Sequence, residues 1–198
     1  MERANPLSVN CGSHAECPPL PEGDLWVFAY GSLMWDPGFP YAESRPALLR
    51  GYHRSFCIWS ARYRGTPEQP GLVLGLDRGG ACRGIAFRIA RDTVGTALAL
   101  LWTREMSRLT YQPRVVRIAV QSERVAALTF VADPRRDGYA GRMSDEEVAA
   151  RIVCCAGARG PNIEYLANTL QHLHELGVHD ERLARIYAVV KGLSAPVQ

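Results

Sequence analysis

The sequence lacks a long apolar run, and it lacks a segment dominated by charge of one sign. Its longest apolar stretches, residues 25–30 and 98–102, are far shorter than the roughly 20 residues that a transmembrane helix needs. The net charge is only +3, and the arginines are scattered instead of forming the basic runs of a nucleic-acid-binding surface. These absences predict no membrane partner and no nucleic-acid partner. The N-terminus also lacks the apolar segment of a secretory signal, so the cytoplasm is the expected location.

The common signatures of enzyme active sites are missing as well. There is no G-x-S-x-G, no H-E-x-x-H, no glycine-rich phosphate loop and no C-x-x-C. These absences argue against the commonest serine hydrolases, zinc peptidases, nucleotide-binding enzymes and thioredoxin-like proteins.

The six cysteines are expected to be reduced thiols, because cytosolic proteins rarely rely on disulfides. One spacing has a metal-binding character, since Cys11, His14 and Cys17 offer three zinc ligands. No fourth ligand is near, and the segment is rich in proline. We interpret residues 1–23 as a disordered leader, and we predict no metal and no cofactor.

The composition is that of an ordinary globular protein, with 198 residues of which 47% are hydrophobic. Residues 24–198 are therefore expected to form a single domain. Up to about residue 131 the pattern predicts short strands at Leu25–Tyr30, Leu48–Ser60, Leu72–Leu76, Cys82–Ile89, Val115–Val120 and Val125–Val131. The run Asp77-Arg78-Gly79-Gly80 predicts a hairpin between two of them. Strands joined by turns favour an antiparallel sheet or a small barrel.

Helical spacing appears once among the strands and dominates beyond residue 134. Asp92 is a candidate cap for a helix that ends near Ser107. Ser144 and Glu147 have the spacing of a capping box. Two further helices are expected, one opened by Pro161 and ended by Gly177, and one starting at Asp180. The predicted class is α+β, with the helices packed on the sheet.

Glu105 occupies an unusual place for a carboxylate. It stands on the apolar stripe of its helix, four residues after Leu101 and eleven after Val94. Burial there raises a carboxyl pKa toward neutrality, which suits a general base and acid near pH 7. The alternative is that the stripe ends one turn earlier and that Glu105 pairs with Arg104 or Arg108 at a frayed helix end. Periodicity alone does not decide between the two.

The turn Tyr30-Gly31-Ser32-Leu33 follows an apolar strand. Successive N–H groups in such a turn, with the Ser32 hydroxyl, can bind a carboxylate or stabilise an oxyanion. An ordinary strand-to-loop turn remains the alternative interpretation.

Several motifs in order resemble the ChaC family of glutathione-specific γ-glutamylcyclotransferases, especially its bacterial branch. The resemblance runs from about Leu25 to Leu193 and is carried by residues 27–35, 49–56, 64–71, 84–88, 101–106 and 160–166. It implies a small mixed β-barrel or sheet with flanking helices. It also implies cleavage of glutathione into 5-oxoproline and cysteinylglycine, through attack of the substrate's own α-amine on its γ-amide.

The resemblance also implies which residues act. Glu105 corresponds to the family's general base and acid, and residues 64–71 correspond to a loop near the site. The family's substrate loop falls on Phe28, Ala29, Tyr30, Gly31, Ser32 and Leu33. Tyr111 and Tyr139 are possible pocket residues. No metal or cofactor is implied, and the oligomeric state is left open. The competing hypotheses are a cyclotransferase for other γ-glutamyl peptides or γ-glutamylamines, and a non-catalytic binding or regulatory protein.

Overall fold

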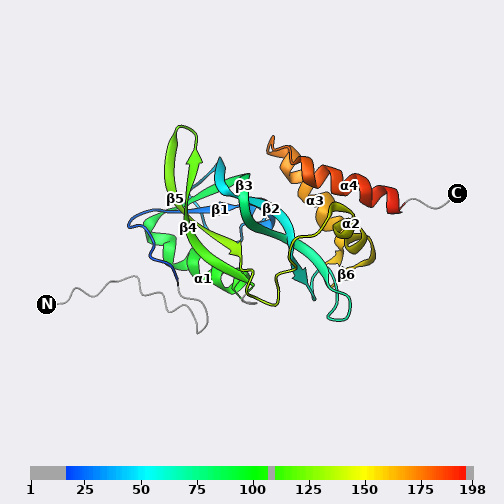
Figure 1. Ribbon diagram of the computed structural model, residues 1–198. Helices are drawn as coiled ribbons and strands as arrows, with labels where there is room; N and C mark the ends of the chain where they lie inside the picture. The colour runs from blue at the N-terminus through cyan, green and yellow to red at the C-terminus, as the bar shows by residue number, and fades with distance from the viewer. Residues whose placement is uncertain (1–16, 107–109, 195–198) are drawn as a thin grey trace.

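The computed structural model describes residues 17–106 and 110–194. Within them, strands close into a barrel in the order β1-β3-β2-β4-β5 (Figure 1). The bounds are β1 Leu25–Ala29, β2 Glu43–Ser60, β3 Gly71–Ile89, β4 Tyr111–Val120 and β5 Glu123–Ala132. Neighbouring strands are antiparallel except for β1 and β5, whose parallel pairing closes the barrel. Of the two predicted arrangements, the small barrel is the one observed.

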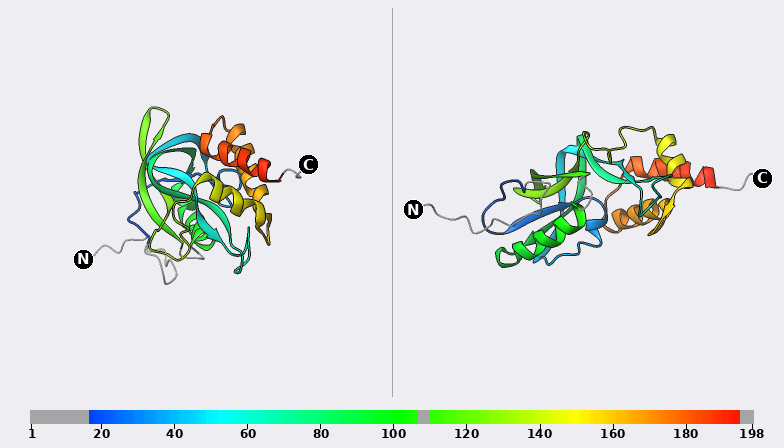
Figure 2. Two further views of the ribbon diagram at one scale, coloured as in Figure 1. Left: turned by 45° about the vertical axis from the view of Figure 1, so that its right-hand side comes forward. Right: turned by 90° about the horizontal axis from the view of Figure 1, so that it is seen from below.

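Helices pack on two sides of this barrel. The principal helices are α1 Val94–Glu105, α2 Asp145–Cys154, α3 Asn162–Glu175 and α4 Glu181–Ser194. Two short 3₁₀ turns, η1 Ser32–Met34 and η2 Arg91–Thr93, and the pair β6 Ala156–Gly157 and β7 Gly160–Pro161 complete the described elements. Helix α1 lies against the barrel, whereas α2, α3 and α4 gather beside the projecting end of the β2–β3 ribbon (Figures 1 and 2). The α+β class is confirmed.

The hairpin predicted at residues 77–80 is wrong, because β3 passes through them without a break. Gly79 and Gly80 have φ of +100° and +67°, and Gly51 on β2 has φ of +86°. The β2–β3 register shifts beside Gly51. Glycines with left-handed backbone serve tight turns and β-bulges alike. Here they form an irregularity inside a long ribbon, which carries β2 and β3 beyond the barrel.

Three predicted helix starts are confirmed and one is wrong. Pro161 is the N-cap of α3. Ser144 and Glu147 form the capping box of α2, with reciprocal bonds of 3.1 and 2.8 Å. Asp180 precedes α4, and its carboxylate accepts a backbone N–H of the first turn at 3.1 Å. Asp92 does not cap α1, because it lies inside η2 and leaves the N-cap position to Thr93.

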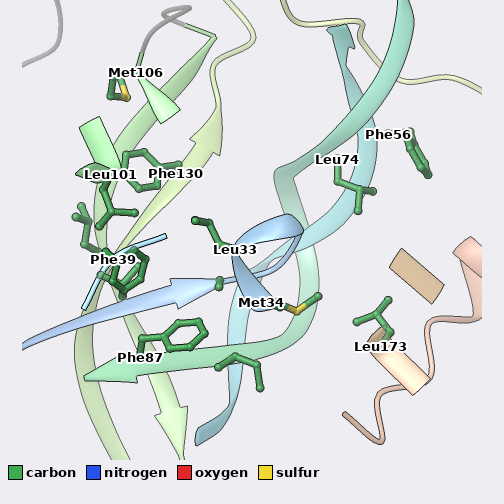
Figure 3. Packing of buried hydrophobic residues seen from close by; sticks show 14 of the residues in the cluster. Leu33, Met34, Phe39, Phe56, Leu74, Phe87, Leu101, Met106, Phe130 and Leu173 are labelled. Atoms are coloured by element: carbon green, nitrogen blue, oxygen red, sulfur yellow. The ribbon is translucent and has the colours of Figure 1, made fainter. Parts of the chain in front are cut away.

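The larger apolar cluster joins strands of the barrel to the helices packed against them. Leu33 and Met34 of η1 enter this cluster (Figure 3). Their neighbours in it come from every layer of the fold and include Leu74, Phe87, Leu101, Phe130 and Leu173. Burial of the Leu33 and Met34 side chains fixes the η1 turn in place and stabilises the fold by about 1.5–3 kcal/mol for each of them.

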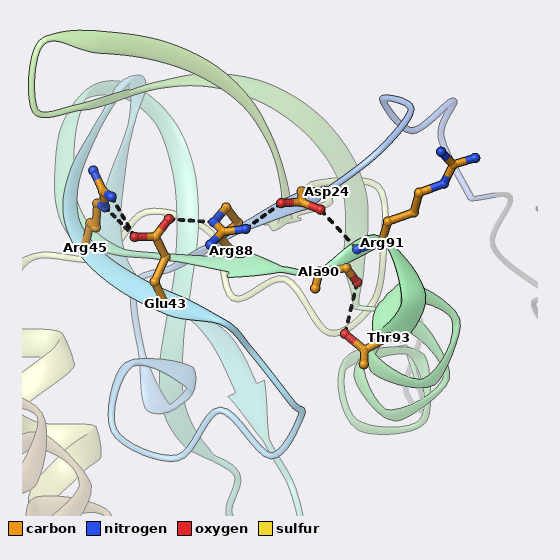
Figure 4. Close-up of polar contacts among 7 residues, drawn as sticks. All are labelled: Asp24, Glu43, Arg45, Arg88, Ala90, Arg91 and Thr93. Carbon is orange, nitrogen blue, oxygen red and sulfur yellow. Dashed lines mark hydrogen bonds and ion pairs between the residues drawn. The ribbon is translucent and has the colours of Figure 1, made fainter.

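A chain of ion pairs crosses the outside of the barrel where β1 begins (Figure 4). Arg88 binds Glu43 and Asp24 at 2.5 Å each, and Glu43 also binds Arg45 at 2.6 Å. The Arg88 hydrogen bonds lower the pKa of both acids. Asp24 further accepts the Arg91 N–H at 3.1 Å. Each exposed pair contributes little to stability. Together they connect the residue before β1 with β2, β3 and the η2 turn that leads into α1.

Residues 1–16 of the predicted leader, with Cys11 and His14, lie outside the described residues. Of the remainder, Cys17 and Leu20 pack against the main apolar cluster. Free thiols are found, as expected, at Cys57, Cys82, Cys154 and Cys155. Over the part of the chain that the structure describes, no helix is long and apolar enough to span a membrane.

Candidate functional site

Two contiguous cavities lie between η1, the end of α1 and α3. The small cavity, of about 40 Å³, is lined by residues 30–33 with Leu74, Glu105, Tyr111, Phe130 and Tyr165. The wide cleft has a volume of about 620 Å³ and continues outward over Trp59, Arg62, Arg64 and Arg159. The residues that line both are Ser32, Glu105, Tyr111 and Tyr165. The small cavity is therefore the inner end of the wide cleft.

The η1 loop, residues 30–36, follows directly from the buried end of β1. Backbone N–H groups at its far end donate to the carbonyl oxygens of Gly31 and Ser32 at 2.8 to 3.3 Å. The first N–H groups of a 3₁₀ turn have no acceptor inside the turn. The N–H groups of Ser32 and Leu33 accordingly have no partner among the described residues. The loop keeps two backbone donors for a ligand on residues that line the small cavity.

The predicted substrate loop divides into a lining part and a supporting part. Tyr30, Gly31, Ser32 and Leu33 line the small cavity. Phe28 and Ala29 do not, because they belong to β1 and are wholly buried in the barrel. The Tyr30 hydroxyl donates to the Phe130 carbonyl at 2.8 Å, and burial raises its pKa. This bond fixes the point at which the chain leaves the strand and enters the loop.

Glu105 is the last residue of α1, and its carboxylate reaches the wall shared by both cavities. The side chain is only 15% exposed. Burial raises its pKa, and the charge of Arg104 opposes the rise. The C-terminus of a helix carries partial negative charge, which also disfavours a carboxylate there. The group is thus set to exchange a proton at a higher pH than an exposed glutamate.

The structure combines the buried position of Glu105 with one part of the alternative, the ion pair to Arg104. The apolar stripe is present, because Val94, Leu98 and Leu101 are buried. The ion pair is present too, with Arg104 Nε 3.3 Å from Glu105 Oε1. The competing partner, Arg108, lies outside the described residues. Pairing with a flanking arginine therefore does not withdraw the carboxylate from the cavity.

Arg104 ties the end of α1 to the η1 loop. Besides Glu105, its guanidinium donates to Ser32 Oγ at 3.0 Å and to the Asp36 carbonyl at 2.6 Å. The carboxylate and the loop are thus attached to one rigid, planar group. A shift of the helix end would move the loop with it.

Two tyrosines of the cavity wall bind the backbone of the same residue, Leu74. Tyr111 donates its hydroxyl to the Leu74 carbonyl at 3.0 Å, and the Tyr165 hydroxyl accepts the Leu74 N–H at 3.4 Å. Burial raises the pKa of Tyr165 to about 12, and the charge of Glu105 adds to the rise. The Tyr165 phenol therefore stays protonated near neutral pH. Both tyrosines hold the inner wall and place their hydroxyl groups beside the cavity.

Asn162, the first residue of α3, explains how Tyr165 reaches this wall. Its side-chain amide accepts the Leu72 N–H at 2.7 Å and donates to the Leu72 carbonyl at 2.8 Å. These two groups face away from β2, so the amide takes the place of a neighbouring strand. Two residues further along β3, Leu74 meets Tyr165. The helix is docked on the strand edge through consecutive hydrogen-bonding positions.

Tyr139 does not line either cavity. It bridges to Ile58 at the edge of β2, and its hydroxyl donates to Asp77 Oδ2 at 2.9 Å. Its place is against the β2–β3 ribbon. Tyr111 is the one of the two predicted pocket tyrosines that the structure brings to the cavities.

Arg54 holds the η1 loop from behind. Its guanidinium is 2% exposed and donates to the Tyr30 carbonyl at 2.6 Å, the Arg83 carbonyl at 2.7 Å and Asp180 Oδ2 at 2.8 Å. One buried cation thus joins the loop, β3 and the start of α4. Because its charge is compensated by Asp180, losing either partner leaves a buried charge unpaired.

No pattern in the sequence indicates a site role for Tyr165, Asn162, Arg54 or Arg104. Nearest to a signal is the position of Arg104, which directly precedes Glu105. Asn162 and Tyr165 stood in a family-like segment, but their contacts are made with β3, about 90 residues away. No local pattern reports a contact of that kind.

A metal centre is not evident within the described ranges 17–106 and 110–194, where no three His, Cys, Asp or Glu side chains lie together. The chemistry that the site offers is that of one desolvated carboxylate, tyrosine hydroxyls and two backbone donors. Such a set suits proton transfer next to a developing oxyanion.

The closed barrel with its flanking helices is a fold shared with a solved γ-glutamylcyclotransferase. The solved structure of a yeast γ-glutamylcyclotransferase specific to glutathione superposes with a TM-score of 0.78. It is 20% identical and covers 86% of this chain and 96% of its own. The likeness establishes the fold.

Sequence comparison then gives the family. The family model described as ChaC-like protein matches residues 25–193, and the chain belongs to this family. The glutathione-specific γ-glutamylcyclotransferase of Escherichia coli K12 is 38% identical over 175 residues, 88% of this chain and 76% of that protein. The human glutathione-specific γ-glutamylcyclotransferase 1 is 36% identical over 182 residues, with 87% and 82% covered.

Proposed function

We propose that this protein is a glutathione-specific γ-glutamylcyclotransferase that releases 5-oxoproline and cysteinylglycine. The observation that carries the proposal is the placement of Glu105, a desolvated carboxylate on the wall that the small cavity shares with the wide cleft. The names of the E. coli and human relatives support the same reaction.

The reaction needs a base and an acid in turn. The substrate's α-amine attacks its own γ-carbonyl carbon, a five-membered lactam closes, and the bond to the cysteine nitrogen breaks. The attacking nitrogen gives up a proton and the leaving nitrogen gains one, so charge and atoms balance. Glu105 takes the first proton and returns it to the leaving amine, which requires a carboxyl group whose pKa lies nearer to neutrality than usual.

The η1 loop holds the glutamyl end. Its donors on Ser32 and Leu33 bind the α-carboxylate, so that the neighbouring amine points at the γ-carbonyl. Gly31 leaves room for this end, because a Cβ there would lie 3.7 Å from the Tyr165 hydroxyl across the small cavity. The cysteinylglycine part then extends into the wide cleft.

No protein nucleophile, metal or cofactor is assigned a step, because the substrate supplies both the nucleophile and the leaving group. Holding the two ends in line contributes about 7–11 kcal/mol toward the barrier through effective concentration. A cytoplasmic location fits this proposal, since the glutathione pool there is reduced.

The test is direct. Purified protein is incubated with glutathione, and 5-oxoproline and cysteinylglycine are measured by mass spectrometry, with γ-Glu-Ala and γ-glutamyl-ε-lysine as competing substrates. We expect both products from glutathione and less turnover of the other two. Absence of both products would refute the proposal, and preferred turnover of a γ-glutamylamine would assign the other substrate class.

A further inference from the structure

The outer end of the wide cleft is rich in arginine. Arg62 and Arg159 both lie over the ring of Tyr63, with Cζ 5.5 and 4.7 Å from its centroid. Arg64 lies over the ring of Tyr165, with Cζ 5.5 Å from the centroid. Aromatic faces hold guanidinium groups in place and leave their N–H edges free to bind an anion.

The acidic residues of the cleft do not neutralise this end. Asp36 and Glu105, the two acids that line the cleft, are both bound by Arg104 at the inner end. Glu164 stands 3.9 Å from Arg64, but its side chain is 59% exposed. Neither Arg62 nor Arg159 has an acidic partner among the described residues. The outer end therefore carries an excess of positive charge.

The main chain builds this cluster from two distant segments. The turn between β6 and β7 pairs with residues 62–63, since the N–H groups of Ala158 and Arg159 donate to the carbonyls of Arg62 and Tyr63 at 2.8 and 3.0 Å. Gly157 makes the approach possible, because a Cβ there would lie 2.6 Å from the backbone of Gly65 and Tyr63. Backbone hydrogen bonds therefore fix the segment that carries Arg159 beside the segment that carries Arg62 and Arg64.

Arg64 is the best placed of the three. Its side chain is only 13% exposed, and burial lowers its pKa from the usual value, although a guanidinium stays charged near neutral pH. One nitrogen, Nη1, donates to the Pro161 carbonyl at 2.9 Å. Its other N–H groups have no hydrogen-bond acceptor within residues 17–106 and 110–194. A buried charge with donors to spare is suited to a ligand carboxylate.

Tyr165 connects the reacting centre with Arg64. Its hydroxyl lies beside Gly31 in the small cavity, and the Arg64 guanidinium lies over its ring, with Cζ 5.5 Å from the centroid. A leaving group of two residues extends about 7 Å. A carboxylate at its end would reach the guanidinium of Arg64 while the γ-carbonyl stays beside Glu105.

We propose that Arg64, assisted by Arg159, binds the C-terminal carboxylate of a γ-glutamyl tripeptide and thereby selects glutathione over shorter or uncharged γ-glutamyl compounds. This inference rests on the proposed function. A γ-glutamyl dipeptide carries its carboxylate one residue too early for this subsite, and a γ-glutamylamine carries none.

The test compares two substrates that differ only in this charge, glutathione and glutathione with a C-terminal carboxamide. Four variants are used: Arg64→Gln, Arg64→Lys, Arg159→Gln, and Arg117→Gln as a matched control at an exposed position on β4. We expect wild-type kcat/KM to be about 10- to 100-fold lower for the carboxamide, mainly through KM. Arg64→Gln should lower kcat/KM for glutathione by about the same factor relative to wild type. Its kcat/KM for the carboxamide should equal that of wild type.

We expect Arg64→Lys to restore part of the kcat/KM for glutathione. Arg159→Gln should lower this kcat/KM less than Arg64→Gln does, and Arg117→Gln should leave it unchanged. The inference is overturned if wild type uses both substrates equally, or if Arg64→Gln loses the same factor on both. Circular dichroism establishes that each variant is folded, and kcat/KM on both substrates is compared only among folded variants. A failure of the proposed function is distinguished from a failure of this inference by the wild type alone, because it would then release no 5-oxoproline from glutathione.

Discussion

Replacing Asn162 tests how the inner wall of the cavity is held. Asn162→Ala leaves the N–H and the carbonyl of Leu72 buried without partners, because the amide satisfies both in the native protein. An unsatisfied buried group costs about 1–3 kcal/mol, so the two together should lower the free energy of unfolding by about 2–6 kcal/mol. A typical domain has only about 5–15 kcal/mol in total. The substitution should therefore remove a large share of the stability.

The assay is urea unfolding at neutral pH, followed by tryptophan fluorescence. Asn168→Ala is the matched control, because Asn168 is an exposed asparagine on the same helix. It should change the free energy of unfolding by less than about 0.5 kcal/mol. Turnover per folded molecule should also fall in Asn162→Ala, since Tyr165 loses its anchor one turn away. The reasoning is refuted if Asn162→Ala is as stable as the control.

The remaining predictions concern the carboxylate, the loop, the metal and pH. Glu105→Gln should lower kcat by at least about 10²-fold with the fold intact, and near-normal turnover would contradict the assignment. Burial raises the pKa of Glu105, so the folded state favours its protonated form. The wild type should therefore be as stable as Glu105→Gln at acid pH and become less stable than this variant as the pH rises through the raised pKa. The activity of the wild type should increase over the same pH range. If the free energies of unfolding of wild type and Glu105→Gln differed by the same amount at every pH, this explanation would be wrong. Gly31→Val should abolish most turnover, because its side chain fills the small cavity. Gly31→Ala should retain more activity, because its Cβ would make only an ordinary contact of 3.7 Å. Equal kcat/KM in Gly31→Val and wild type would show that the glutamyl end binds elsewhere. Activity should survive dialysis against EDTA, and a loss that zinc restores would return attention to Cys11, His14 and Cys17.

Local patterns predicted the parts of the molecule that depend on local geometry. The apolar stripe that placed Glu105 on a buried face is a property of one helix, and so is the capping box of Ser144 and Glu147. The hairpin at residues 77–80 was wrong for a related reason. Glycines report that the backbone needs a left-handed conformation, but they do not say whether the chain reverses or merely bulges.

The wall and the outer end of the site could not be predicted in this way. Asn162 meets Leu72, and Arg159 lies beside Tyr63, across about 90 residues of chain. Such contacts follow from how the β6–β7 turn and α3 dock on the β2–β3 ribbon. A polar side chain that completes a strand edge looks the same in the sequence as one that faces solvent.

The contact between Arg54 and Asp180 has a consequence for the order in which the site matures. Arg54 shapes the η1 loop through the Tyr30 carbonyl, but its countercharge stands 126 residues further along, at the start of α4. During synthesis the loop and the barrel strands emerge long before that helix exists. Until Asp180 arrives, a cation is left unpaired beneath the loop, and the glutamyl end has no settled binding surface. Turnover should thus begin only once the segment that carries Asp180 has been made, so a chain that stops before Asp180 would not consume glutathione.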